Sequence, residues 1–184
     1  MNDWKQCVKE TVEAMGSRCG EMPPDYAEDT MVIMSVNPIF VRKTADAKAL
    51  VIEAKLLSGL NGFEKNNPPR QELLKIGAQI AGAIRVDVVC RLDEEHDNII
   101  ASLTVLLADG MPDLITLAQC IGDLSQTQKK FDDFLSGKIT DEEADRIVQK
   151  NWLNQQIKDR TPQQIAAELI KGADEIEKLF NNLK

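Results

Sequence analysis

The 184-residue chain has very little of the side-chain chemistry that metal sites and many enzymes require. It contains one histidine, His96, and aromatic residues make up only 4% of the chain. A single histidine among carboxylates does not provide the closed ligand set of a zinc site. The scarcity of aromatic rings leaves little stacking surface for bases or flat cofactors. The core is therefore expected to consist of Leu, Ile, Val and Ala.

Long apolar runs are also missing. No window reaches the roughly 18 consecutive apolar residues of a membrane span. The first residues lack a basic segment followed by an apolar stretch, so we expect no secretory signal and a cytoplasmic location. The formal net charge is −8, and such a field repels phosphate backbones and anionic lipids. We therefore expect neither nucleic acid nor membrane as a partner.

The four cysteines have no short paired spacing and lie in periodic apolar stretches, at Cys7, Cys19, Cys90 and Cys120. This pattern favours buried, reduced thiols that pack as small apolar side chains. A catalytic cysteine would need a base within reach. His96 is the only histidine available, and it lies in an acidic predicted turn.

The remaining candidates for chemistry have simpler interpretations. The turn at residues 93–98 lacks the glycine and glutamate of a calcium loop, so His96 is expected to be solvated there. No phosphate-binding glycine motif occurs. The paired carboxylates fall on polar helix faces or loops: Asp25/Glu28, Asp132/Asp133 and Glu142/Glu143. The sequence thus predicts no catalytic residue, no metal site and no cofactor, and hence a protein that is not an enzyme.

Hydrophobic periodicity predicts a mixed order of helices and strands. An amphipathic helix spans residues 4–19, with Gly20 as its left-handed cap, and a linker follows at 21–25. Strands are predicted at 30–36, 39–44 and 49–57, and a polar loop at 58–69. A helix that includes residues 73–84 follows, then a hairpin of strands at 86–93 and 99–107. A long helix opens at residues 111–113 and stops at Gly137.

The C-terminal part differs in character. Residues 140–143 form a capping box, and a second helix start lies at 161–164. We therefore expect an α+β domain at residues 1–137, with an antiparallel sheet of about five strands in the order α-β-β-β-α-β-β-α. Two additional helices at 138–184 would form a hairpin packed on this domain or on a partner.

Alternation divides the sheet into two faces. Leu50, Ile52, Ala54 and Leu56 should face the helices. The opposite face carries apolar side chains that are candidates for binding a partner: Val51, Leu57, Val89, Ile100 and Leu106. These side chains could equally lie under the C-terminal hairpin. Gly77 and Gly82, inside a predicted helix, indicate close approach either of the protein's own sheet or of a partner subunit.

This order of elements, together with the acidity, resembles the small type III secretion chaperones. The resemblance covers about residues 2–137. It implies a bacterial homodimer that holds the secretion segment of an effector in extended form on its surface, without nucleotide. In that family the middle helix contributes to the dimer seam, which implies a dimer interface here at Ile76, Gly77, Ile80 and Ile84.

The leading hypothesis is therefore a non-catalytic, cytoplasmic protein-binding module that is chaperone-like and dimeric. One alternative is a small-molecule sensor or enzyme with a pocket under the C-terminal helices. Another is an immunity or inhibitor protein whose acidic surface occupies a folded basic partner.

Overall fold

The computed structural model describes residues 3–23, 29–35, 37–57, 69–139 and 141–158. Its elements, in chain order, are α1 (Trp4–Ala14), β1 (Arg18–Glu21), β2 (Thr30–Met34), β3 (Ile39–Lys43), β4 (Ala49–Leu57), α2 (Arg70–Ile84), β5 (Val89–Asp93), β6 (Asn98–Ala108), β7 (Met111–Pro112), α3 (Leu114–Leu135) and α4 (Asp141–Lys158). The predicted α+β class and the order of the five expected strands are confirmed, and β1 and β7 add to them.

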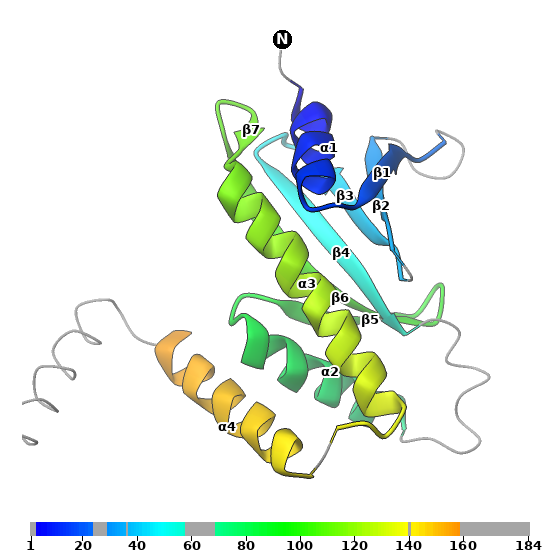
Figure 1. Ribbon diagram of the computed structural model, residues 1–184, viewed down its shortest axis with the longest axis vertical. Coiled ribbons are helices and arrows are strands. Elements are labelled where there is room, and N and C mark those ends of the chain that lie inside the picture. The colour runs from blue at the N-terminus through cyan, green and yellow to red at the C-terminus, as the bar shows by residue number, and fades with distance from the viewer. Residues whose placement is uncertain (1–2, 24–28, 36, 58–68, 140, 159–184) are drawn as a thin grey trace, which may run out of the picture.

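The strands form one antiparallel sheet in the order β1-β2-β3-β4-β6-β5, with β7 paired to the end of β6 (Figure 1). The three predicted strands β2, β3 and β4 pair in sequence order as a meander, and β5 and β6 make the predicted hairpin. The long strands β4 and β6 pair over most of their length and form the centre of the sheet.

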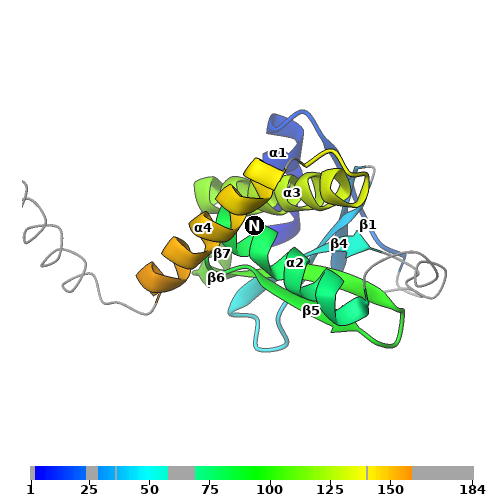
Figure 2. The same cartoon turned by 90° about the horizontal axis from the view of Figure 1, so that it is seen from below.

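One face of the sheet is covered by helices. Leu50, Ile52, Ala54 and Leu56 of β4 are each at most 2% exposed, as the alternation predicts. They pack in one apolar core with side chains of α1, α2 and α3, among them Val8, Leu73 and Phe131. Figure 2 shows these helices on the same side of the sheet. Gln128 joins α3 to β4, because its side-chain amide nitrogen donates a hydrogen bond to the carbonyl oxygen of Lys55 at 3.0 Å.

The N-terminal prediction was partly wrong. α1 ends at Ala14 instead of running to Cys19, and Gly16, at a φ of +75°, turns the chain. Residues 18–21 then form β1, in which Cys19 pairs with Ile33 and Gly20 with Val32. Gly20 is thus a strand residue and not a helix cap. Pairing with β2 decides this conformation, and such a non-local partner leaves no periodic signal in four residues.

The start of the long helix also needs a correction. Met111 and Pro112 pair with β6 as β7, and α3 begins at Leu114. The Asp113 carboxylate accepts a hydrogen bond from the Thr116 amide at 2.8 Å and so caps the helix. Gly137, at a φ of +66°, ends the turn that follows α3, as predicted.

The C-terminal extension is described only in part. α4 packs against α2 (Figure 1). The predicted loop at 58–69 (except residue 69), the capping residue Thr140 and the predicted last helix lie outside the described residues, so the two-domain division stays a prediction. Among the described helices, none is long and apolar enough to cross a membrane.

Candidate protein-binding surfaces

The sheet face opposite the helices is the first candidate surface, and within the described residues no helix packs on it. Strand register places its side chains, and we call it the open face: Val32, Met34, Phe40, Arg42, Val51, Glu53, Lys55, Val89, Arg91, Ile100, Ser102, Thr104 and Leu106. The open face mixes apolar and charged side chains, which is typical of an antiparallel sheet with one solvated side.

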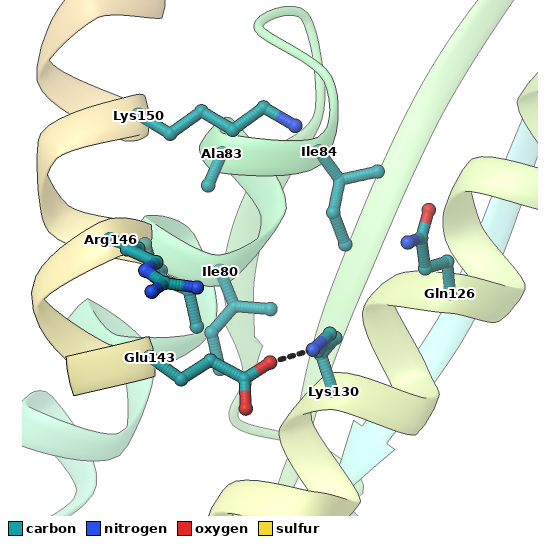
Figure 3. A pocket seen from close by; sticks show the side chains of 9 residues that line it. Ile80, Ala83, Ile84, Gln126, Lys130, Glu143, Arg146 and Lys150 are labelled. Atoms are coloured by element: carbon teal, nitrogen blue, oxygen red, sulfur yellow. Dashed lines mark hydrogen bonds and ion pairs between the residues drawn. The ribbon is translucent and has the colours of Figure 1, made fainter. Parts of the chain in front are cut away.

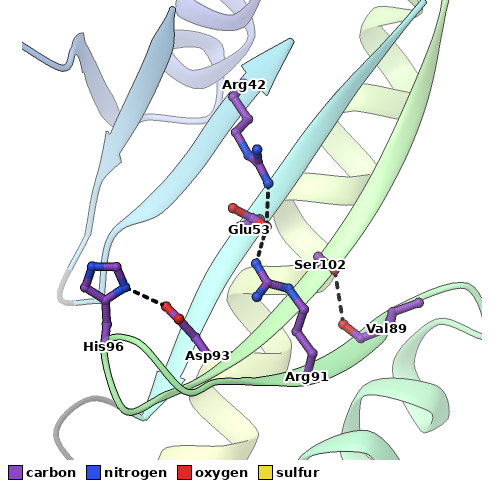
Figure 4. A network of polar contacts seen from close by, with 7 residues as sticks. All are labelled: Arg42, Glu53, Val89, Arg91, Asp93, His96 and Ser102. Atoms are coloured by element: carbon purple, nitrogen blue, oxygen red, sulfur yellow. Dashed lines mark hydrogen bonds and ion pairs between the residues drawn. The ribbon is translucent and has the colours of Figure 1, made fainter. Parts of the chain in front are cut away.

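A charged network lies in the middle of the open face (Figure 4). The Glu53 carboxylate accepts hydrogen bonds from Arg91 at 2.9 Å and from Arg42 at 3.2 Å. Burial by itself would raise the pKa of Glu53, but the two guanidinium groups together outweigh it and lower that pKa. Beside this network, the Lys55 ammonium lies 5.4 Å from the centroid of the Phe40 ring. The network thus joins side chains of β3, β4 and β5 and reaches across β6, which lies between β4 and β5 in the sheet.

Large apolar side chains flank these charges. Met34 is 64% exposed, Val89 is 56% exposed and Leu106 is 78% exposed. Of the other predicted partner-binding residues, Val51 and Leu57 are half-buried, whereas Ile100 is buried. Leu57 lies beside a register shift between β4 and β6, which interrupts the regular alternation there. The predicted partner-binding residues therefore differ in exposure, and Leu106 and Val89 offer the most apolar area to a partner.

The second candidate surface is a hollow of about 420 Å³ between α1 and α3, which we call the α1–α3 groove. Its lining is mostly apolar or small, with a few polar groups: Glu10, Thr11, Ala14, Met15, Leu114, Ile115, Ala118 and Gln119. Met15 is 43% exposed, Leu114 is 50% exposed and Ile115 is 70% exposed. Three large apolar side chains thus meet solvent around one hollow, and such a cluster marks an interaction site more often than scattered apolar residues do.

Sequence reasoning missed this groove. Met15 and Leu114 belong to the helix stripes that were expected to face the core. The available signal was Ile115, which extends the apolar surface of α3 beyond that stripe. The groove itself depends on how α1 and α3 approach each other, and the spacing of residues along either helix does not contain that information.

The residues implied as a dimer seam lie mainly inside the protomer. Ile80 is 3% exposed, and Ile76 and Ile84 are half-buried against the core. A methyl group at Gly77 would lie 3.2 Å from Leu56 Cδ1 and 3.5 Å from Phe131 Cε2. The close approach expected at Gly77 is therefore to the protein's own sheet and α3.

Gly82 has a different neighbour. The Asn154 amide nitrogen of α4 donates to the Gly82 carbonyl oxygen at 2.6 Å. A methyl group at Gly82 would overlap the side-chain amide of Asn151. α4 therefore covers the C-terminal part of α2, the helix that the resemblance implies as the dimer seam.

The groups considered for catalysis do not come together. His96 is exposed and contacts only Asp93, at 3.1 Å, among its described neighbours (Figure 4). Burial raises the pKa of the Cys90 thiol to about 12 and also raises the pKa values of Cys7, Cys19 and Cys120. Such thiols stay protonated near neutral pH and are poor nucleophiles. Among the described residues, no group of three His, Cys, Asp or Glu side chains is placed to hold a metal ion.

Comparison with known proteins finds similarity to a solved structure. No protein-family model matches the chain, and a search of the curated proteins finds no match. The fold is similar to a chain of the HopA1–SchA chaperone–effector complex, with a TM-score of 0.49 and 13% sequence identity. The match covers 70% of this chain and 91% of that one.

Proposed function

We propose that the protein is a non-catalytic binding module that holds a segment of another protein, in the manner of a secretion chaperone. The observation that carries this proposal is the α1–α3 groove, where Met15, Leu114 and Ile115 are exposed around one apolar hollow. Filling a water-exposed hollow of this composition with an apolar side chain is favourable, because apolar surface is removed from water. Burial of one Leu-sized side chain contributes about 1.5–3 kcal/mol.

The client would present apolar anchors together with basic residues. Glu10 lies at the rim of the groove, and the net charge of the protein is −8. This charge favours approach of a basic segment and sets its orientation. An amphipathic helix or an extended strand would suit the groove, since both place apolar side chains at regular intervals along one face.

The open face is the second contact surface of the proposal. Leu106 and Val89 offer apolar area there, beside the charged network at Glu53. A client that extends from the groove onto this face would meet both apolar contacts and fixed charges. A cytoplasmic location and a homodimer complete the proposal, although the dimer has to form with α4 lying over Gly82.

The test is capture of binding proteins from the native lysate, followed by mass spectrometry. Ile115→Asp tests the groove and Leu106→Asp tests the open face, because both side chains are exposed and their replacement leaves the core intact. Val148→Asp is the matched control, since Val148 is 47% exposed on α4, away from both surfaces. We expect one client to bind the wild type and the control but to be lost from Ile115→Asp.

Two results would contradict the proposal. Equal capture by all four proteins would mean that neither surface binds the client. A tight complex in which the partner stays fully folded, measured by hydrogen exchange of the partner, would instead indicate an immunity or inhibitor protein.

A further inference from the structure

A separate cavity of about 480 Å³ lies between α2, α3 and α4. Its apolar floor consists of Ile80, Ala83 and Ile84 of α2 and Ile147 of α4. Polar side chains from α3 and α4 surround the opening: Gln126, Lys130, Glu143, Arg146 and Lys150 (Figure 3). The volume is in the usual range of about 300–1,000 Å³ for sites that bind small molecules.

The charge at this opening differs in sign from that of the whole protein. Three basic side chains and one carboxylate line it, in a chain whose net charge is −8. Lys130 forms an ion pair with Glu143. Arg146 and Lys150 have no hydrogen-bond or ion-pair partner in the part of the chain that the structure describes. Two cations without a partner among the described residues therefore flank an apolar cavity.

We propose that this cavity binds a small amphipathic carboxylate, with its hydrocarbon chain on the isoleucine floor and its carboxylate at Arg146 and Lys150. A guanidinium group binds a carboxylate through two parallel hydrogen bonds, which an ammonium group cannot do. A purely apolar ligand would bury the floor but leave both cations without a counter-charge. A small inorganic anion would satisfy the cations but leave the floor exposed to water.

The chemistry of the opening limits the head group to a low charge. Glu143 lies among the cations and already forms an ion pair with Lys130. The remaining two positive charges match one carboxylate better than a polyphosphate. The site does not depend on the proposed client-binding surfaces, because its lining shares no residue with the α1–α3 groove or the open face.

The test is a titration of the full-length protein with decanoate. Calorimetry measures the binding, and NMR records the resonances of the Ile80 and Ile147 methyl groups. We expect saturable binding with shifts of both methyl resonances. Arg146→Gln and Lys150→Gln should each weaken binding by about tenfold or more, because each removes charge-assisted hydrogen bonding to the carboxylate. Lys48→Gln, in the exposed turn before β4, is the matched control and should bind like the wild type.

Two further probes decide the class of ligand. Acetate that binds as tightly as decanoate would overturn the proposal in favour of a simple counter-ion site. Decanol that binds as tightly would overturn it in favour of an apolar site. If an acidic peptide binds at these methyl groups and decanoate does not, the cavity belongs to a protein partner instead. Capture of a client by Arg146→Gln reports separately on the proposed function, and we expect it to be unchanged.

Discussion

Asn154 of α4 donates its side-chain amide to the main-chain carbonyl oxygen of Gly82 in α2, at 2.6 Å, and approaches the Ala83 carbonyl oxygen at 3.4 Å. Both carbonyls lie in the last turn of α2, where no intrahelical amide is available to them. The two helices are thus joined where one of them has unsatisfied acceptors. The absence of a side chain at Gly82 permits this approach.

Gly82→Leu should displace α4 without unfolding the sheet. A leucine side chain would occupy the space that the side-chain amides of Asn151 and Gln155 now fill. We expect faster amide exchange throughout residues 141–158 and unchanged protection of β4 and β6. The matched control is Gly122→Leu on α3, because no other described residue lies within 4 Å of a methyl group at Gly122, apart from the backbone of its own helix and the two adjacent residues. Equal protection of α4 in Gly82→Leu would contradict the proposed role of this glycine.

Gly77→Val should lower the stability of the protomer itself. The added methyl groups would press on Leu56 and Phe131, and such overpacking costs about 1–3 kcal/mol. Urea unfolding at two protein concentrations measures the effect, with Gly122→Val as the control for β-branching in a helix. We expect the same loss at both concentrations. A loss that grows on dilution would place Gly77 in a subunit interface after all.

Glu53 should contribute stability that depends on pH. Its pKa is lowered in the folded state, so the contribution is present above the unfolded pKa of about 4.3 and is lost as the pH falls through the folded value. The free energy of unfolding of the wild type should therefore exceed that of Glu53→Gln by more at pH 6 than at pH 3. Denaturant unfolding at several pH values measures this difference. The control is Glu95→Gln in the exposed hairpin turn; the same pH trend there would contradict a specific role for Glu53.

Ile80 is a poor position for testing the dimer, because its side chain is buried and its substitution would disturb the core. An exposed residue of α2 gives a clearer test. Ala78 is exposed on α2, so Ala78→Arg leaves the core intact. If α2 forms the seam, light scattering should show a dimer for the wild type and a monomer for Ala78→Arg. A dimer that survives this substitution would exclude the exposed face of α2 as the seam.

Sequence pattern was most accurate where burial alternates strictly. In β4 every second side chain is buried, and turn residues bound the strand, so both ends agree with the prediction. β1 was missed because four residues that include Gly20 have no recognisable period. Its conformation comes from pairing with β2, which begins nine residues after β1 ends. Among the expected site residues, the alternation placed Val89 and Leu106 outward but could not show that Ile100 is buried.

The sequence by itself determined the α+β class, the acidity, the presence of only one histidine and the apolar face of each main element, because composition and local period depend only on the order of residues. The tertiary structure decided the α1–α3 groove, the position of α4 over Gly82, and the meeting of Lys130 with Arg146 and Lys150. These features arise from the crossing of helices that are distant in the chain. Crossing is set by how whole faces pack together, which spacing within a single helix does not specify.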